Sequence, residues 1–261
     1  MELTYTNAEI TDKNERRTNW LAAFGLQDVD NLKVSDYAID LSEEHIEGNM
    51  TIDEVENAIS TYYSKIDSTE KEIARQNEAD IVSARIMRII NNLSNVCGEH
   101  SLRRIHKALF KGFDNYGPGL YRACDIIKPE WVLDNDTVQY VHYDDIEDSI
   151  SVEFKNQGHD IVGITSFISR LWHIHPFLEG NTRTVAVFSV KYFRSLGYIV
   201  DNAPFENNAK YFRNALVRAN YDNRLLGIRK DISFLVAFFE NILFNKENIT
   251  ENRKLHINWK G

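Results

Sequence analysis

Long stretches free of proline and glycine constrain the fold of this chain more than any other feature of its sequence. The 261 residues include only four prolines and twelve glycines, and between them apolar residues recur at every third or fourth position. This spacing places apolar side chains along one face of an α-helix, whereas a strand would need alternation at every second residue. The sequence therefore predicts an all-α protein.

Charge and apolar runs exclude several classes of partner. Thirty Lys and Arg residues against thirty-nine Asp and Glu residues give a net charge of −9, and an acidic chain repels a phosphate backbone. The longest apolar run, Phe234 to Phe239, is far shorter than the roughly twenty residues that span a bilayer. The first residues also lack the basic and apolar stretches of a secretory signal. We therefore expect a cytoplasmic protein that binds neither nucleic acid nor membrane.

Two local signals stand out before the middle of the chain. Thr51 and Glu54 have the spacing of a capping box, which predicts a helix from there to about residue 65. Later, a turn-forming run at residues 134–136 is followed by alternating apolar and polar residues. This pattern predicts a β-hairpin from Ile127 to Tyr140, lying as a small ribbon on the helical body.

The residues with the most chemistry lie in a polar loop between two apolar helical patterns, at residues 175–184. His175 is a titratable base, and Glu179 is a carboxylate suited to Mg²⁺. Gly180 allows a tight turn, and Asn181 is a good N-cap for the helix that follows. Arg183, in the first turn, opposes the helix dipole, so its presence indicates a compensating bound anion. A base, a metal ligand, free amides and an arginine favour phosphoryl or nucleotidyl transfer.

Residues 175–183 read His-Pro-Phe-Leu-Glu-Gly-Asn-Thr-Arg, which closely resembles the Fic family motif H-x-F-x-D/E-G-N-G-R-x-x-R. Gly119 to Arg122, followed by the expected hairpin, resembles the family's segment before its substrate-positioning flap. The resemblance covers about residues 70–245. It implies a mostly helical enzyme that transfers AMP from ATP to a protein hydroxyl. It also divides the chain into an N-terminal helical extension (1–65), a Fic core domain (66–245) and a C-terminal tail (246–261).

Carried over by position, the resemblance implies specific roles for the loop residues. His175 would take the proton from a target Ser, Thr or Tyr hydroxyl, and Phe177 would anchor the loop in the core. Glu179 would bind the Mg²⁺ that bridges the α- and β-phosphates. Asn181, with the amides of residues 180–183, would hold the α-phosphate, and Arg183 would grip the β-phosphate.

The sequence departs from the family pattern at two positions. Thr182 replaces the usual second glycine, so we expect ordinary helical backbone angles there and an amide that stays available. Ala186 stands where the family has its second arginine, so the usual γ-phosphate contact is missing. Gly180 is present where the phosphate-transferring Doc relatives have alanine, which favours nucleotidyl transfer by analogy.

Residues outside the loop carry weaker signals. Ile46 to Asn49 resembles the family's N-terminal inhibitory segment, with Glu47 as the inhibitory carboxylate, but Glu43 stands in its Ser/Thr position. The alternative is that Gly48 ends a helix and Glu47 is solvated. Asn208 and Tyr211 fall where family members approach the adenine and ribose, although polar capping explains the same residues.

Histidines outside the motif have simpler interpretations. His173 is expected to support the fold. His106, with nearby basic residues, is expected on a solvated helix face.

The leading hypothesis is a protein adenylyltransferase that uses ATP and Mg²⁺, with the N-terminal segment as an inhibitor. The alternatives are another nucleotidyl, phosphocholine or phosphate transfer on the same scaffold, or a nucleotide-binding module without turnover. The expected partner is a target protein whose hydroxyl docks at the 127–140 hairpin as an added strand. The sequence leaves a homo-oligomer open.

Overall fold

Helices build the protein, as the apolar periodicity predicts. The computed structural model describes residues 9–66, 70–94 and 97–259. Its ten α-helices are α1 (Lys13–Gly25), α2 (Asp36–Glu47), α3 (Ile52–Ser64), α4 (Lys71–Asn91), α5 (Ser101–Phe110), α6 (Ile146–Lys155), α7 (Ile161–Ile174), α8 (Asn181–Ser195), α9 (Ala203–Asn220) and α10 (Ser233–Phe244). Five short 3₁₀ turns are η1 (Leu26–Asp30), η2 (Asp114–Tyr116), η3 (Trp131–Leu133), η4 (Tyr143–Asp145) and η5 (Asn252–Leu255). Among these residues the only β pairs are two isolated bridges, so the all-α prediction is confirmed.

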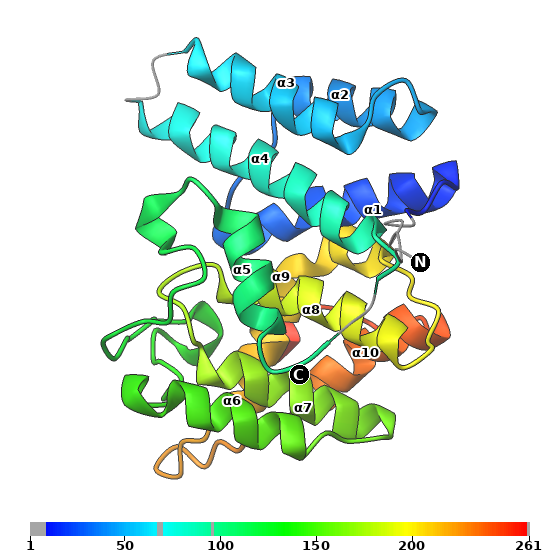
Figure 1. Ribbon diagram of the computed structural model, residues 1–261. Coiled ribbons are helices and arrows are strands. Elements are labelled where there is room, and N and C mark those ends of the chain that lie inside the picture. The colour runs from blue at the N-terminus through cyan, green and yellow to red at the C-terminus, as the bar shows by residue number, and fades with distance from the viewer. Residues whose placement is uncertain (1–8, 67–69, 95–96, 260–261) are drawn as a thin grey trace, which may run out of the picture.

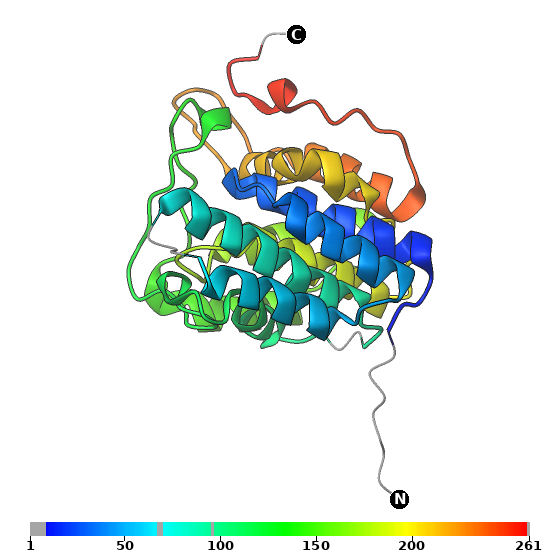
Figure 2. The same cartoon turned by 90° about the horizontal axis from the view of Figure 1, so that it is seen from above.

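The helices stack in layers, with α8 in the middle (Figure 1). α3 packs on α4, α2 packs on α1 and α3, and α4 and α1 separate α2 and α3 from the rest of the body. α5, α8 and α9 form the central layer, and α6, α7 and α10 close the opposite side. Seen from above, the C-terminal tail crosses the outside of the helical body (Figure 2). The loop at residues 175–180 therefore joins two helices of the interior.

Two apolar cores divide the interior. The larger one includes residues from α1, α4 and α5 and from α7 to α10. In α8 every residue from Asn181 to Phe193 is buried, so this helix is surrounded by protein on all sides. A smaller core lies between α1, α2, α3 and α4, around Trp20, Val55 and Met87. α1 and α4 contribute to both cores.

Local signals set the ends of several helices. The capping box at α3 is confirmed, because the Thr51 hydroxyl accepts from the Glu54 amide and the Glu54 carboxylate accepts from the Thr51 amide. At Gly25, where α1 ends, a Cβ would lie 2.3 Å from the carbonyl oxygen of Phe205. Only glycine therefore permits the close crossing of α1 over α9.

Residues 127–141, called the flap segment below, do not form the expected strand pair. Residues 131–133 form η3 instead, and Asp134 and Asn135 both have left-handed backbones. Val132 and Leu133 are both buried, which a strand with one solvent-facing side does not allow for consecutive residues. The β-hairpin prediction is therefore corrected to a folded loop whose arms insert side chains into the body.

The tail fastens the flap segment from outside. Leu255 in η5 is buried, and the amide of Ile257 donates to the carbonyl of Val132 at 2.9 Å.

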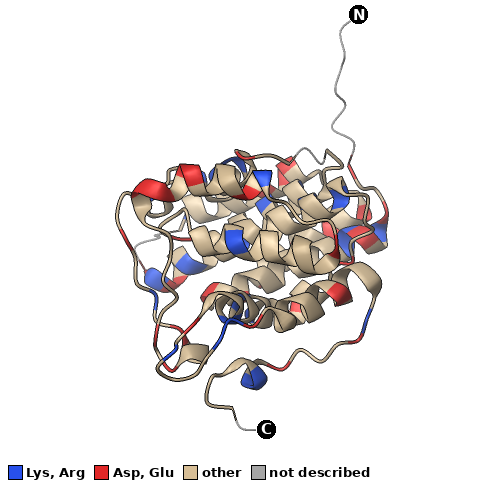
Figure 3. Ribbon diagram, turned by 90° about the horizontal axis from the view of Figure 1, so that it is seen from below, with Lys and Arg blue, Asp and Glu red and all other residues tan. Residues whose placement is uncertain are grey.

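Acidic and basic residues are interspersed over the elements seen from below (Figure 3). Of the helices described, none is long and apolar enough to cross a membrane.

Candidate active site

The loop between α7 and α8 makes two left-handed turns. His175 ends α7 with φ of 50°, and Gly180 precedes α8 with φ of 74°. A Cβ on Gly180 would lie 2.4 Å from the Phe110 ring. Glycine at this position thus satisfies both a positive φ and a close contact, as the sequence predicts.

Asn181 closes the loop rather than capping the helix. The N-cap of α8 is Gly180, and Asn181 is the first helical residue, so the N-cap prediction is wrong. The Asn181 side chain accepts from the Phe177 amide at 3.0 Å and donates to the Phe177 carbonyl at 2.8 Å. Both ends of this side-chain amide bond to the loop backbone, so Asn181 positions the loop as well as lining the cavity described below. The backbone amides of residues 181–183 remain at the helix start, where α-helical bonding leaves them without partners.

His175 is buried and held in one orientation. Its ring lies 4.1 Å from the Tyr140 ring and edge-on to Trp172. Burial lowers the pKa of His175 well below its usual value, and the charge of Lys128 lowers it further. The ring is therefore neutral. The Trp172 carbonyl, an acceptor, lies 3.3 Å from Nδ1, so Nδ1 carries the proton and Nε2 is left as the basic nitrogen.

Buried cationic and aromatic groups anchor the loop from behind. The Arg122 guanidinium donates to the carbonyls of His175 and Cys124 at 2.9 and 2.8 Å, and also to the carbonyl of Val141. The Arg122 amide donates to the Pro176 carbonyl. Arg122 thereby joins the loop to the end of the flap segment.

His106 lies in the interior, which corrects the expectation of a solvated helix face. The Gly119 amide donates to its Nδ1, so Nε2 carries the proton and donates to the Glu179 carbonyl at 3.1 Å. Its ring stacks on Phe177 at 3.7 Å. His173 supports the flap segment through a 2.7 Å bond to the Gln139 carbonyl.

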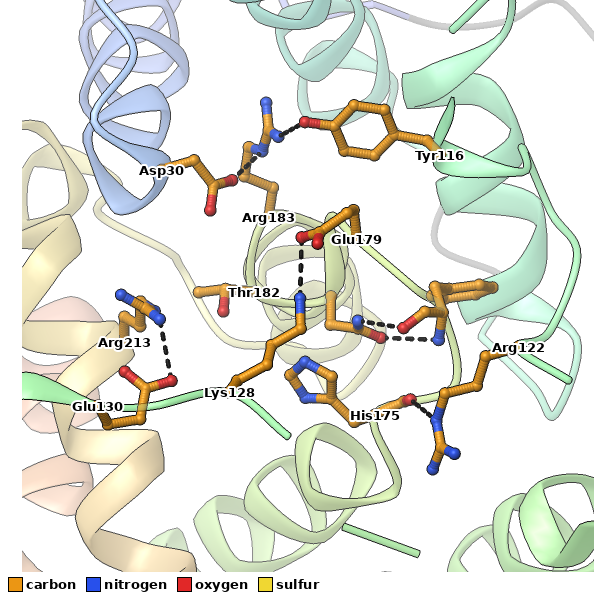
Figure 4. A network of polar contacts seen from close by, with 12 residues as sticks. Asp30, Tyr116, Arg122, Lys128, Glu130, His175, Glu179, Thr182, Arg183 and Arg213 are labelled. Carbon is orange, nitrogen blue, oxygen red and sulfur yellow. Dashed lines mark hydrogen bonds and ion pairs between the residues drawn. The ribbon is translucent and has the colours of Figure 1, made fainter. Parts of the chain in front are cut away.

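A cavity of about 30 Å³ lies in front of this loop (Figure 4). The residues that line it are Asp30, Lys128, Glu130, Trp172, His175, Glu179, Gly180, Asn181, Thr182 and Arg213. The Thr182 hydroxyl accepts from the Trp172 indole at 3.0 Å, and Thr182 lies in the first turn of α8 as expected. Only half of the lining residues belong to residues 175–183; the others come from η1, the flap segment, α7 and α9.

Glu179 reaches the cavity from the loop and is half exposed. Its carboxylate accepts from the Lys128 ammonium at 2.8 Å (Figure 4). Asp30 and Glu130 are the other two carboxylates that line the cavity, and each is paired with an arginine. Among the described residues no three His, Cys, Asp or Glu side chains gather as a metal site. The donor set still fits Mg²⁺, because this ion is usually held by one or two carboxylates and completed by waters and substrate phosphates.

Arg183 is turned away from the cavity, which corrects its expected position. It is fully buried, and its Nη2 donates to Glu78 and Tyr116 at 2.8 and 3.0 Å. Its Nη1 donates to Gln27 at 3.0 Å, and its Nε lies 2.9 Å from the Asp30 carboxylate. Burial alone would lower the pKa of Arg183, but Asp30, Tyr116 and Glu78 raise it above its usual value. The sequence indicated a bound anion as the partner of Arg183, and in the structure its partners are instead Asp30 and Glu78 of the chain itself.

α9 presents Arg213 to the cavity, not the residues that the family resemblance indicated. Arg213 donates to the buried carboxylate of Glu130 at 2.9 Å. Tyr211 is buried against α10, with its hydroxyl 3.3 Å from the Phe234 carbonyl. Positions 211 and 213 lie about 200° apart around a helix, so they face opposite ways. Asn208, at a kink in α9, bonds to Thr250 of the tail, and the structure brings neither Asn208 nor Tyr211 to the loop.

Glu47 lies in the outer layer, away from the loop. It is the last residue of α2, pairs with Lys13, and is followed by Gly48 as a left-handed cap. The structure therefore does not bring the expected inhibitory carboxylate to the motif. Ala186 is fully buried within α8.

Four cavity residues had no sequence signal. Asp30, Lys128, Glu130 and Arg213 belong to segments whose local patterns indicate only a turn, a hairpin and a helix. Their distances in sequence from His175 range from tens of residues to more than a hundred, so only the tertiary packing reveals them.

One comparison, with protein-family models, gives a match that includes the loop. The sequence model of the Fic/DOC family matches residues 95–193, which include α5, α6, α7, the loop and most of α8. This match confirms the resemblance for that part of the chain. A solved structure with a partial match is the N-terminal Fic domain of a Bep effector protein, a substrate of the VirB T4SS, from Bartonella sp. AR 15-3. It is 19% identical, with a TM-score of 0.48, and the similarity covers 68% of this chain and 86% of that one. No curated protein matches the chain.

Proposed function

We propose that the protein is a transferase of the Fic/DOC family, whose sequence model matches residues 95–193, and that it transfers AMP from ATP to a Ser, Thr or Tyr hydroxyl of a target protein. One observation carries the proposal. A neutral, oriented His175 lines the same cavity as Asn181 and Thr182, the residues that begin α8. A base and a set of fixed donors are the two elements that hydroxyl attack on a phosphate requires.

His175 acts as the general base. Its Nε2 takes the proton as the target hydroxyl attacks the α-phosphate, and the pyrophosphate leaves on the opposite side. The low pKa keeps the ring unprotonated at neutral pH, so the base is available in the resting protein. A positioned base of this kind contributes about a hundredfold to ten-thousandfold in rate.

The start of α8 stabilises the charge that develops on the α-phosphate. The amides of Asn181, Thr182 and Arg183 point out of the helix N-terminus, where the helix dipole also favours negative charge. The contacts of Asn181 with Phe177 and of Trp172 with Thr182 hold these amides in place. Removing one such donor from an active site typically costs about a hundredfold or more in rate.

Glu179 would hold the Mg²⁺ of the nucleotide complex, with Asp30 facing it across the cavity. When bound, Mg²⁺ would neutralise the charge of the phosphates. The cavity of about 30 Å³ holds roughly one water and no nucleotide. Nucleotide binding therefore requires side chains that fill the cavity to move, and Lys128 would have to leave Glu179.

The target protein would approach over the flap segment. Ile127 and Trp131 are exposed there, at 79% and 57%. Since this segment forms no ladder, a target would dock against its exposed side chains rather than as a paired strand.

Restraint by the N-terminal region is part of the proposal, but with different residues. Asp30 of the N-terminal extension, together with Glu78 of α4 and in place of Glu47, would hold Arg183 away from the cavity. The β-phosphate would have to compete with Asp30 for Arg183.

The test is incubation of the purified protein with α-³²P-ATP and Mg²⁺, followed by autoradiography and mass spectrometry of the labelled proteins. His175→Ala is the inactive variant, and His159→Ala, at an exposed position outside the cavity, is the matched control. We expect an AMP adduct in the wild type and in His159→Ala only. Equal labelling by His175→Ala would contradict the proposal. Parallel reactions with other nucleoside triphosphates and CDP-choline distinguish the related transfers.

A second candidate is a nucleotide-binding module without turnover. It is favoured by the burial of Arg183 and by Ala186, since neither residue offers a cation to the cavity. This candidate predicts nucleotide binding with no label on any protein, including the chain itself.

A further inference from the structure

The cavity in front of His175 has its own source of positive charge, independent of the arginine in the loop. The two cationic side chains that line it are Lys128, from the flap segment, and Arg213, from α9. Arg183 is buried behind the loop with Glu78 and Asp30. A polyphosphate entering the cavity would therefore meet Lys128 and Arg213 first.

Lys128 is placed to exchange partners. Its ammonium lies 2.8 Å from the Glu179 carboxylate, and the two side chains are 24% and 54% exposed. Ion pairs with this exposure contribute little to stability, so breaking the pair costs little. The backbone of Lys128 is held separately, since its amide donates to the Thr137 hydroxyl at 3.1 Å. The ammonium is thus free to swing while the main chain stays in place.

Arg213 is held more firmly. Its Nη2 donates at 2.9 Å to Glu130, whose side chain is only 3% exposed, while the Arg213 side chain is 31% exposed. The structure gives Arg213 this one hydrogen-bonded partner among the described residues. The remaining donors of a planar guanidinium suit bidentate contact with phosphate oxygens.

We propose that Lys128 and Arg213 bind the β- and γ-phosphates of the nucleotide, with Lys128 releasing Glu179 as it does so. The inference rests on the proposed function and deepens it, because it assigns the triphosphate contacts to residues outside the 175–183 loop. Both act in binding and positioning the substrate, and His175 remains the base. The exchange also leaves the Glu179 carboxylate open to a divalent cation.

Nucleotide affinity tests this assignment without relying on transfer. Binding of a non-hydrolysable ATP analogue, ADP and AMP would be measured by calorimetry with Mg²⁺ present. For Lys128→Ala we expect the affinity for the ATP analogue to fall about tenfold or more, the usual effect of losing a charged hydrogen bond. AMP affinity should change less than twofold. Lys128→Arg should retain most of the affinity.

Matched variants control for charge and folding. Lys210→Ala removes an α9 lysine that pairs with Asp28 and does not line the cavity, so it should bind like the wild type. For Arg213, the double variant Glu130→Gln with Arg213→Gln avoids leaving a buried carboxylate alone. It should weaken ATP analogue binding while its Tm stays close to that of the wild type.

Each outcome decides the question. If the variants lose the same factor of affinity for AMP as for the ATP analogue, the inference is wrong. It is also wrong if Lys128→Ala binds the analogue more tightly than the wild type, because Lys128 would then only compete for Glu179. If the wild type transfers AMP and Lys128→Ala binds the ATP analogue as tightly as the wild type does, the inference is wrong while the proposed function stands. A wild type that binds none of the three nucleotides would contradict the proposed function as well.

Discussion

The loop at residues 175–183 and the flap segment face each other across the cavity, yet different kinds of contact hold them. Buried groups behind the loop bind its backbone: Arg122 holds the His175 carbonyl, His106 holds the Glu179 carbonyl, and Asn181 closes on Phe177. The flap segment reaches the cavity through side-chain ion pairs, of which the Lys128 to Glu179 pair is partly exposed.

This difference suits two separate requirements of the site: donors held in a fixed position and a way in for the substrate. Catalytic donors must be held within a fraction of an ångström, which buried backbone anchors achieve. A group that must let substrate in needs contacts that are cheap to break, and partly exposed ion pairs have that property. We therefore expect substitutions behind the loop to affect stability and transfer strongly, and substitutions on the flap segment to affect mainly binding.

The largest effect is expected for Arg122→Ala. This change leaves the carbonyls of His175, Cys124 and Val141 without their buried donor. The expected loss is about 3–5 kcal/mol in the free energy of unfolding, measured by urea denaturation. Arg229→Ala, at an exposed arginine, should cost under about 0.5 kcal/mol. A loss below about 1 kcal/mol for Arg122→Ala would mean that the loop keeps its shape without this anchor.

Acid should release the loop next. Burial lowers the pKa of His106 to about 4, whereas an unfolded histidine has a value near 6.5. Between these values the unfolded state binds more protons, so the free energy of unfolding falls as the pH decreases from 6.5 to 4. The contribution of this group is about 3 kcal/mol at most, because one pKa unit corresponds to about 1.4 kcal/mol. Urea denaturation at several pH values and NMR titration of the ring measure it; titration near pH 6.5 would contradict the assignment.

A pair of glycine substitutions isolates the close contact at the loop. Gly180→Ala and Gly227→Ala both place alanine at a positive φ, but a Cβ meets the Phe110 ring only at Gly180. In both variants the strained backbone should lower the free energy of unfolding by about 1 kcal/mol. The clash with the Phe110 ring should lower the free energy of unfolding of Gly180→Ala by a further ~1–3 kcal/mol. Its transfer activity should fall as well. If thermal or urea unfolding gives equal losses of unfolding free energy for the two variants, the Phe110 ring moves aside at no cost.

The flap segment should tolerate loss of one of its own contacts. The hydroxyl of Tyr221, a buried residue, donates to the exposed carboxylate of Asp136 at 2.5 Å. Tyr221→Phe removes this bond and the one that the hydroxyl accepts from Asn223 at 3.0 Å, so it should lower the free energy of unfolding by about 1–3 kcal/mol, the usual net value of two hydrogen bonds. It should leave the pH dependence of transfer unchanged, since His175 is not involved. A loss comparable to that of Arg122→Ala would remove the distinction between the two regions.

The smallest effect is expected for Glu47→Gln. Glu47 pairs with Lys13 on the outer layer and contacts neither the loop nor the flap segment. Exposed pairs contribute about 0–1 kcal/mol, so the free energy of unfolding should fall by no more than about 1 kcal/mol. The rate of self-labelling should stay within about twofold of the wild type. Glu78→Gln, which removes a partner of the buried Arg183, is the contrasting variant. Brighter labelling by Glu47→Gln would restore the inhibitory segment that the sequence suggested.

The sequence by itself determined the features that depend on neighbouring residues. Apolar spacing predicted the helices, Thr51 with Glu54 predicted the start of α3, and the loop motif placed His175 and Glu179 beside a helix N-terminus. The alternation at residues 137–141 was misleading, because the burial of Val132 and Leu133 together required a 3₁₀ turn instead of a strand.

Only the tertiary structure decided which charges meet. Arg183 is paired with Asp30 and Glu78, which lie more than a hundred residues earlier in the chain. Arg213 faces the cavity and Tyr211 the core because α9 packs against α10 in one rotation. Local sequence sets the period of a helix but not its rotation against its neighbours. The partners of a buried charge therefore follow from the packing of the whole chain.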